Sequence, residues 1–159
     1  MACYIFGAGG FYGLPQRPAA GDTVIAADGG WRICRRENIT PDLLLGDFDS
    51  LHTVPDFARI RRVPVEKDDT DMMLAIKEGL GRGETEFHLY GGMGGRTDHT
   101  IANLQGLLYL ADHGARGWLY GDDFCWTAVE NETLTLRRQV DWGLVSVFPM
   151  AGEARGVDE

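Results

Sequence analysis

Residues 87–120 read FHLYGGMGGRTDHTIANLQGLLYLADHGARGWLY and contain the pattern that decides the fold. A short apolar run at Phe87–Tyr90 leads into glycines, then into a helical pattern that stops at Gly114, then into a second apolar run at Trp118–Tyr120. Short apolar runs bounded by turn residues are typical of buried strands. A strand, a helix and a strand in this order predict parallel strands joined by a crossover helix.

The same alternation extends toward the N-terminus. Further strands are expected at Cys3–Phe6, Thr23–Ala27, Leu43–Leu45 and Arg62–Val65. A weak helical pattern covers Gly30–Glu37, and a clearer one starts at Thr70. Apolar stripes are expected on the two clearer helices, at Met73, Ile76 and Leu80, and at Ile101, Leu104, Leu107, Leu108 and Ala111. Residues 1–121 are therefore predicted to form an α/β domain, Rossmann-like, with a mostly parallel sheet and flanking helices.

The pattern of apolar residues changes at residue 122. Strand-like runs at Phe124–Val129, Thr133–Leu136 and Leu144–Phe148 follow one another with turn residues and no helix between them. These runs predict the start of a β-sandwich over residues 122–159. The sandwich is expected to be incomplete, because the sequence ends before further strands could close it.

Charge and cysteine content restrict the class of partner. The formal net charge is -9, from 24 acidic and 15 basic residues, which argues against a surface for nucleic acid or anionic lipid. It would suit a cationic small molecule; the alternative explanation is that the acidity only keeps the protein in solution. Three widely spaced cysteines lack metal-binding or redox spacing. With no signal peptide pattern and no membrane-length apolar run, the expected location is the cytoplasm.

Aspartates follow several of the predicted strands. Asp28 follows one strand, Asp47 and Asp49 follow the next, and Asp68 and Asp71 follow the strand after that. The carboxyl ends of parallel strands share one edge, where such sheets bind ligands. Clustered carboxylates repel unless a cation neutralises them, and magnesium prefers carboxylate and phosphate oxygens. A magnesium site is therefore expected at this edge.

The segment from Lys67 to Asp71 supports two interpretations. It has the composition of a helix N-terminus, where an Asp or Thr caps free amides and acidic residues suit the helix dipole. In the functional interpretation, Asp68 or Asp71 also points into the ligand cleft. The second interpretation depends on the other aspartate loops converging there.

Glycine-rich segments occur after two of the strands. In Gly91–Gly95 the glycines let backbone amides approach phosphate oxygens. Arg96 adds a positive charge that can donate two parallel hydrogen bonds to a phosphate. The alternative is a flexible loop capped by Asp98. The segment Gly7–Gly13 departs from the dinucleotide fingerprint, because Tyr12 stands where the final glycine should be. It either lines the nucleotide pocket or forms a tight turn.

In order and spacing, these segments resemble the thiamine pyrophosphokinase family. The matching motifs are Ala27–Gly30, Pro41–Asp42 leading into Gly46–Ser50, Lys67–Asp71, and Gly94–His99 with Asn103. The resemblance runs from about Tyr4 to Val157 and is strongest through Leu108. It implies a nucleotide-binding α/β domain followed by a β-sandwich that helps to bind thiamine across a homodimer interface. The family's later sandwich strands and their Ser-Asn motif are absent from this sequence.

The resemblance also implies roles for individual residues. Asp47, Asp49 and Asp71 are expected at a magnesium site, and the residues expected to bind nucleotide or thiamine are Asp28, Gly29, Gly30, Asp68, Thr70, Arg96, Asp98 and Asn103. Catalysis is expected to use Asp71, Asp98 and Arg96, with either carboxylate accepting the proton.

The implied reaction transfers pyrophosphate from ATP to the thiamine hydroxyl, giving thiamine diphosphate and AMP. Two alternatives remain open. Clustered aspartates followed by Asp98 and His99 would also suit a metal-dependent phosphohydrolase, although few histidines are available as ligands. The second alternative is a non-catalytic module that binds nucleotide or thiamine.

Overall fold

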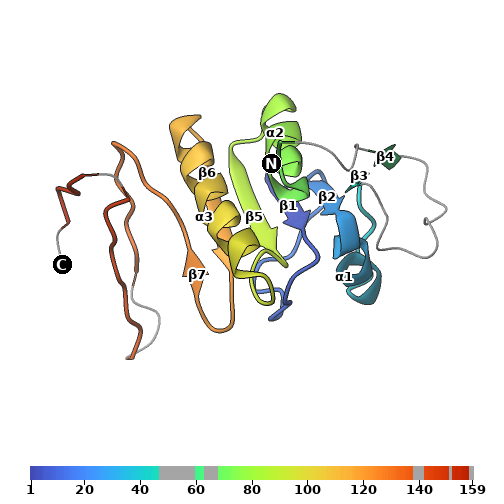
Figure 1. The fold of residues 1–159 in the computed structure, drawn as a ribbon, viewed down its shortest axis with the longest axis horizontal. Helices are drawn as coiled ribbons and strands as arrows, with labels where there is room; N and C mark the ends of the chain where they lie inside the picture. Colours follow the sequence, from blue (N-terminus) through green and yellow to red (C-terminus); the bar gives the residue numbers. More distant parts are fainter. Residues whose placement is uncertain (47–59, 63–67, 138–141, 151, 158–159) are drawn as a thin grey trace.

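A computed structural model describes residues 1–46, 60–62, 68–137, 142–150 and 152–157 (Figure 1). These residues form one sheet flanked by helices. The strands are β1 (Cys3–Phe6), β2 (Thr23–Ala27), β3 (Leu43–Gly46), β4 (Ile60–Arg62), β5 (Glu86–Tyr90), β6 (Arg116–Tyr120) and β7 (Cys125–Trp126). The helices are the 3-10 turn η1 (Asp28–Gly30), α1 (Trp31–Arg36), α2 (Asp71–Gly81) and α3 (Thr97–Asp112).

The sheet runs in the order β4-β3-β2-β1-β5-β6-β7. Neighbouring strands are parallel from β4 through β6, and β7 pairs antiparallel with β6. The predicted α/β fold with a mostly parallel sheet is therefore confirmed. Predicted and observed strand limits agree closely, except that β4 begins at Ile60 and the predicted residues 63–65 lie outside the described residues.

Helices cover both faces of the sheet and divide the core in two. On β5, Phe87 and Leu89 pack with α2 and α3, which lie side by side in Figure 1. His88 and Tyr90 point to the opposite face, where the second cluster contains Ile33 of α1. Strands buried on both faces explain the continuous apolar runs in the sequence.

The predicted apolar stripes on α2 and α3 are confirmed in part, since Ile76 and Leu107 are buried and Met73, Leu80 and Leu104 pack against the core. On α3 the buried residues are Asn103, Gly106, Leu107 and Leu110, whereas Ile101 is 55% exposed. The buried residues of α2 are Met72, Ala75, Ile76 and Gly79. Small residues occupy the closest contacts, since a Cβ on Gly106 would lie 2.9 Å from Ile76 Cδ1. Apolar periodicity misses such positions because glycine contributes no apolar side chain.

Beyond Trp126, the described residues contain no further strand. The expected strand at Phe124–Val129 is reduced to β7. The runs at 133–136 and 144–148 form no strands, so the two strands expected there are wrong for this structure. Apolar side chains remain uncovered there, with Leu144 95% and Trp142 78% exposed. An extended run becomes a strand only when its backbone pairs with a neighbour. The β-sandwich over 122–159 and the domain boundary stay predictions.

Candidate functional site

The direction of the strand connections changes between β1 and β5, which are adjacent in the centre of the sheet. The chain leaving β5 enters α3 on one face, whereas the chain leaving β1 packs Phe11 and Leu14 against the other face. In open parallel sheets, ligands bind beyond the carboxyl ends of strands at such a switch point. Residues around Gly7 and Gly91 therefore mark the expected site.

The loop after β5 has an unusual backbone that glycine makes possible. Gly91, Gly94 and Gly95 adopt φ values of 64°, 80° and 82°, which other residues rarely tolerate. Helix α3 begins at Thr97 directly after this loop. A glycine loop followed by a helix N-terminus presents amide donors and a favourable dipole to an anion. This arrangement agrees with the predicted phosphate-binding loop.

The predicted residues Asp28, Gly29 and Gly30 follow the end of β2, and Gly30 lies against the start of the loop after β1. Asp28 has a φ of 46°, and a Cβ on Gly46 at the end of β3 would lie 3.1 Å from Asp28 Cα. A Cβ on Gly30 would lie only 1.7 Å from the Phe6 carbonyl oxygen, so glycine is required where η1 approaches β1. Gly30 thus has a steric reason for its identity that is independent of ligand binding.

Asp47 and Asp49, two of the three predicted magnesium ligands, lie outside the described residues. Their segment continues from Gly46, which is in contact with Asp28. In the part of the chain that is described, no three His, Cys, Asp or Glu side chains gather as a metal site would require. The predicted site therefore depends on Asp47 and Asp49, whose carboxylate oxygens are of the type magnesium prefers.

The first turn of α2 reaches the switch point. The Met72 methyl group lies 2.7 Å from the position of a Cβ on Gly7 and 3.5 Å from that of a Cβ on Gly92. Asp71 is the residue before Met72 and is the acidic residue of this first turn. The Met72 side chain therefore reaches both glycine segments from the first turn of α2, in which Asp71 also lies. Asp68 lies three residues earlier, in the turn before the helix.

Thr70 is the N-cap of α2, as the helix-terminus interpretation of Lys67–Asp71 requires. Its hydroxyl oxygen accepts a hydrogen bond from the Met73 amide at 3.2 Å. Asp69 is separately engaged with Lys77, whose Nζ lies 2.6 Å from Asp69 Oδ2. Thr70 thus has a structural role, and its predicted contact with substrate stays a prediction.

Replacing Thr70 by Ala should lower the free energy of unfolding by about 1 kcal/mol, because the Met73 amide loses its acceptor. Thr70→Ser retains the hydroxyl and is the matched control, with a change of a few tenths of that value expected. Urea unfolding monitored by circular dichroism measures both variants. Equal stability of the Ala variant and the wild type would contradict the capping role.

Arg96 and Asp98 form a forked ion pair at the start of α3. Arg96 Nε donates to Asp98 Oδ1 at 3.1 Å, and Nη2 donates to Oδ2 at 2.5 Å. Both side chains are about two-thirds exposed, at 69% and 63%. The hydrogen bonds from Arg96 hold the pKa of the Asp98 carboxyl below its usual value. Arg96 is thus held near the glycine loop by a partner that an incoming phosphate could replace.

Asn103 lies on the buried face of α3 and forms a hydrogen bond with the Gly91–Gly95 loop. It is 6% exposed, and its Nδ2 donates to the Gly92 carbonyl oxygen at 2.6 Å. The sequence predicted a residue that binds nucleotide or thiamine. The contact that the structure shows is with the loop itself, so any contact of Asn103 with substrate stays a prediction.

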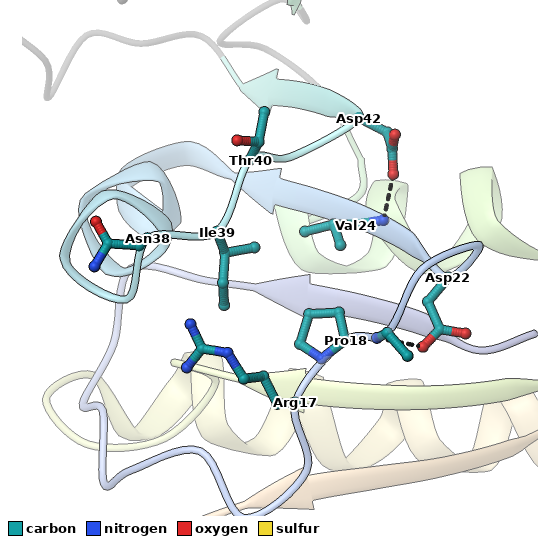
Figure 2. A pocket seen from close by; sticks show the side chains of 9 residues that line it. Arg17, Pro18, Asp22, Val24, Asn38, Ile39, Thr40 and Asp42 are labelled. Atoms are coloured by element: carbon teal, nitrogen blue, oxygen red, sulfur yellow. Dashed lines mark hydrogen bonds between the residues drawn. The ribbon is translucent and has the colours of Figure 1, made fainter.

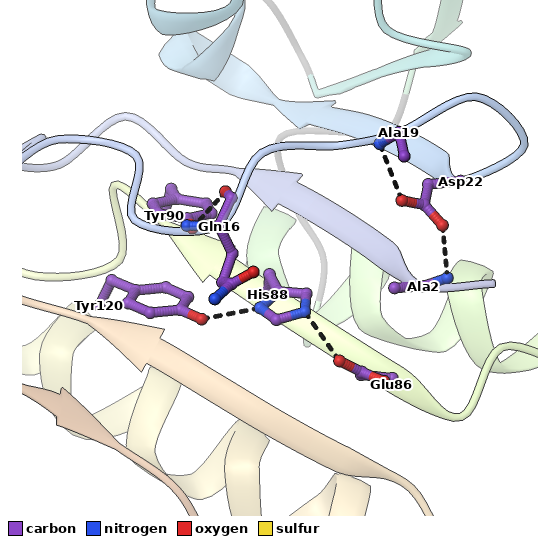
Figure 3. Close-up of polar contacts among 8 residues, drawn as sticks. All are labelled: Ala2, Gln16, Ala19, Asp22, Glu86, His88, Tyr90 and Tyr120. Carbon is purple, nitrogen blue, oxygen red and sulfur yellow. Dashed lines mark hydrogen bonds and ion pairs between the residues drawn. The ribbon is translucent and has the colours of Figure 1, made fainter. Parts of the chain in front are cut away.

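A polar and aromatic cluster on the α1 face of the sheet was not predicted (Figure 3). His88 Nδ1 lies 2.8 Å from the Tyr120 hydroxyl, and His88 Nε2 lies 3.1 Å from Glu86 Oε1. The Tyr90 hydroxyl donates to the Gln16 carbonyl oxygen at 2.7 Å. Burial lowers the pKa of His88 and raises that of Tyr90 to about 12. The cluster fastens the chain that follows β1 across the sheet, partly through Tyr90, which directly precedes the Gly91–Gly95 loop.

A cavity of about 270 Å³ lies at the opposite edge of the sheet, near the amino ends of β2 and β3 (Figure 2). None of the predicted site residues lines it. Its carboxylates support the local fold, since Asp42 Oδ2 accepts from the Val24 amide at 2.8 Å and Asp22 Oδ2 accepts from the Ala19 amide at 2.9 Å. This cavity therefore gives no support to a ligand site.

Comparison with known families agrees with this geometry. Residues 16–119, well over half of the chain, match the family described as thiamin pyrophosphokinase, catalytic domain. The chain belongs to this family. The match contains the first turn of α2, the Gly91–Gly95 loop and all of α3, which together surround the switch point.

Solved structures of thiamine pyrophosphokinases share the fold. The enzyme from Bacillus subtilis superposes with a TM-score of 0.66 at 26% identity, over 76% of this chain and 60% of the other. The enzyme from Geobacillus thermodenitrificans gives a TM-score of 0.63 at 27% identity, over 74% and 59%. The chain thus spans about three-fifths of the length of these relatives. Among curated proteins, the search found no match.

No helix in the described ranges combines the length and apolar character needed to span a membrane. All three cysteines are free thiols, with Cys3 and Cys34 buried and Cys125 exposed.

Proposed function

We propose that this chain transfers pyrophosphate from ATP to the hydroxyl of thiamine, giving thiamine diphosphate and AMP. The observation that carries the proposal is the match of residues 16–119 to the thiamin pyrophosphokinase catalytic domain. The position of the glycine loop at the β1–β5 switch point supports it, since this is where a phosphate chain would bind.

In the proposed reaction, the thiamine hydroxyl oxygen forms a bond to the β-phosphorus of ATP. The bond from the β-phosphorus to the oxygen bridging the α- and β-phosphates breaks, and that oxygen leaves with AMP. The hydroxyl proton passes to a carboxylate. Asp71 and Asp98 are the two candidate acceptors, and the pKa of Asp98 is held low only while its ion pair with Arg96 persists.

The remaining parts of the site align the reactants and neutralise charge. Asp47, Asp49 and Asp71 would hold magnesium, which when bound neutralises phosphate charge. Arg96 would exchange its carboxylate partner Asp98 for a phosphate and bind it through two donors. Asp28, Gly29, Gly30, Asp68 and Thr70 would complete the walls of the nucleotide and thiamine site.

The segment after β7 would contribute the thiamine side of the site. We propose that residues 122–159 begin a β-sandwich that forms part of a cytoplasmic homodimer. Exposed apolar side chains support this proposal, with Val145 69% and Phe148 60% exposed. Side chains of this kind are normally covered by further protein.

AMP release from ATP and magnesium, measured with and without thiamine, tests the proposed reaction. The expected result is AMP that appears only when thiamine is present, in equal amount to thiamine diphosphate. Phosphate or ADP that forms without thiamine would instead indicate a phosphohydrolase. Binding of ATP or thiamine with no product would indicate a non-catalytic binding module.

A further inference from the structure

Two glycine segments, Gly7–Gly10 after β1 and Gly91–Met93 after β5, bind each other at the switch point. The Gly9 amide donates to the Gly91 carbonyl oxygen at 2.7 Å, and the Gly10 amide donates to the Met93 carbonyl oxygen at 2.6 Å. Gly10 and Met93 also form an isolated antiparallel bridge. Beyond the parallel pairing of β1 with β5, the two loops thus form backbone hydrogen bonds of their own.

This contact leaves no space for side chains. A Cβ on Gly9 would lie 2.7 Å from both the Gly91 and Met93 carbonyl oxygens, and a Cβ on Gly91 would lie 2.2 Å from the Gly7 carbonyl oxygen. The obstructing atoms are backbone, so no side-chain rotation could relieve the overlap. Glycine at positions 7, 9 and 91 is therefore explained by the contact between the two segments.

Three successive carbonyl groups of the loop are engaged by donors from the protein. The Gly91 and Met93 carbonyls accept from Gly9 and Gly10, and the Gly92 carbonyl between them accepts from Asn103 Nδ2 at 2.6 Å. A carbonyl oxygen turned toward a phosphate would repel it, because both carry negative charge. Fixing these oxygens on protein donors keeps them from facing an anion.

We infer that Gly9 and Asn103 are positioning residues, which hold the carbonyls of Gly91 and Gly92 away from the phosphate chain of a bound nucleotide. This inference rests on the proposed function, because it takes the Gly91–Gly95 loop as the phosphate-binding loop. Gly9 acts from the β1 side and Asn103 from α3. Affinity for the phosphate chain, rather than for thiamine, depends on both.

Two glycines provide a pair of variants, one at the contact and one remote from it. Gly9→Ala drives a methyl group into two backbone carbonyls, whereas a Cβ on Gly81, the last residue of α2, would meet no neighbouring atom within 4 Å. Neither glycine has a positive φ, so alanine suits both backbones.

Calorimetric titration with MgATP and with inorganic tripolyphosphate tests the inference on wild type and both variants. Gly9→Ala should weaken the binding of both ligands by about tenfold or more, and Gly81→Ala should weaken it by less than about twofold. Thermal melting establishes that each variant is folded. A folded Gly9→Ala variant with wild-type affinity would overturn the inference, and so would a wild type that binds neither ligand.

Asn103→Asp provides a second test, which decides the matter if Gly9→Ala does not fold. The carboxylate keeps the shape of the side chain but replaces the donor to Gly92 with an acceptor, so weaker tripolyphosphate binding is again expected. Lowering the pH should restore affinity, because a protonated carboxyl donates again. Unchanged affinity at neutral pH would overturn the inference. Failure of the proposed reaction would look different, as intact ATP binding without thiamine-dependent AMP.

Discussion

Asp71→Asn is expected to lower magnesium-dependent AMP formation by more than about 100-fold while leaving the fold intact. The substitution keeps the size of the side chain but removes the negative charge proposed to bind the ion. Thr70 still caps α2, so the helix should start at the same residue. Initial rates measured over a range of magnesium concentrations should show both a lower maximum and a higher magnesium requirement.

Asp69→Asn is the matched control for Asp71→Asn. Asp69 belongs to the same segment, but it forms an exposed ion pair with Lys77, and such pairs contribute about 0–1 kcal/mol to stability. The control should retain turnover within about twofold of the wild type. Full activity in Asp71→Asn, or equal losses in the two variants, would contradict a metal-binding role for Asp71.

Arg96→Gln is expected to reduce kcat by about 100- to 1000-fold, the loss typical when one group that stabilises transition-state charge is removed. Arg96 is 69% exposed, so the substitution should leave thermal stability nearly unchanged. Arg96→Lys keeps the charge but loses the forked donors, and an intermediate loss is expected. Steady-state kinetics with ATP as the varied substrate measures both variants.

Arg82→Gln provides the control for loss of an arginine. Arg82 follows α2, in a four-residue segment that leads to β5, and its Nη2 lies 3.0 Å from Glu78 Oε1. This places it at the amino edge of the sheet, away from the glycine loop, so kcat should not change. An Arg96→Gln variant with the kcat of the wild type would show that Arg96 does not stabilise transferring charge.

The positions of the central strands could be predicted from the sequence because these strands are buried on both faces. Thr23–Ala27 is apolar after its first residue and is bounded by Asp on either side, and β2 has these same limits. The buried faces of the helices could be predicted only in part. Gly79 and Gly106 lie at the closest contacts, and a search for apolar residues passes over them.

Part of the site follows from topology, which the sequence pattern already contains. A strand followed by Gly91–Gly95 and a helix predicts a phosphate-binding loop, and the structure places this loop at the switch point. The contact between Gly9 and Gly91 could not be predicted, because it joins segments about eighty residues apart and depends on β1 lying beside β5. Asn103 was likewise identified only as a residue of the family motif, and its hydrogen bond to the Gly92 carbonyl could not be predicted.

ATP radiolabelled at the β-phosphorus would test the transfer of pyrophosphate most directly. The chain is incubated with this ATP, magnesium and thiamine, and the products are separated. If the β-phosphorus is the site of attack, the label should appear in thiamine diphosphate and be absent from AMP. Label that remains in ADP, or that enters inorganic phosphate or pyrophosphate whether or not thiamine is present, would contradict the proposed transfer.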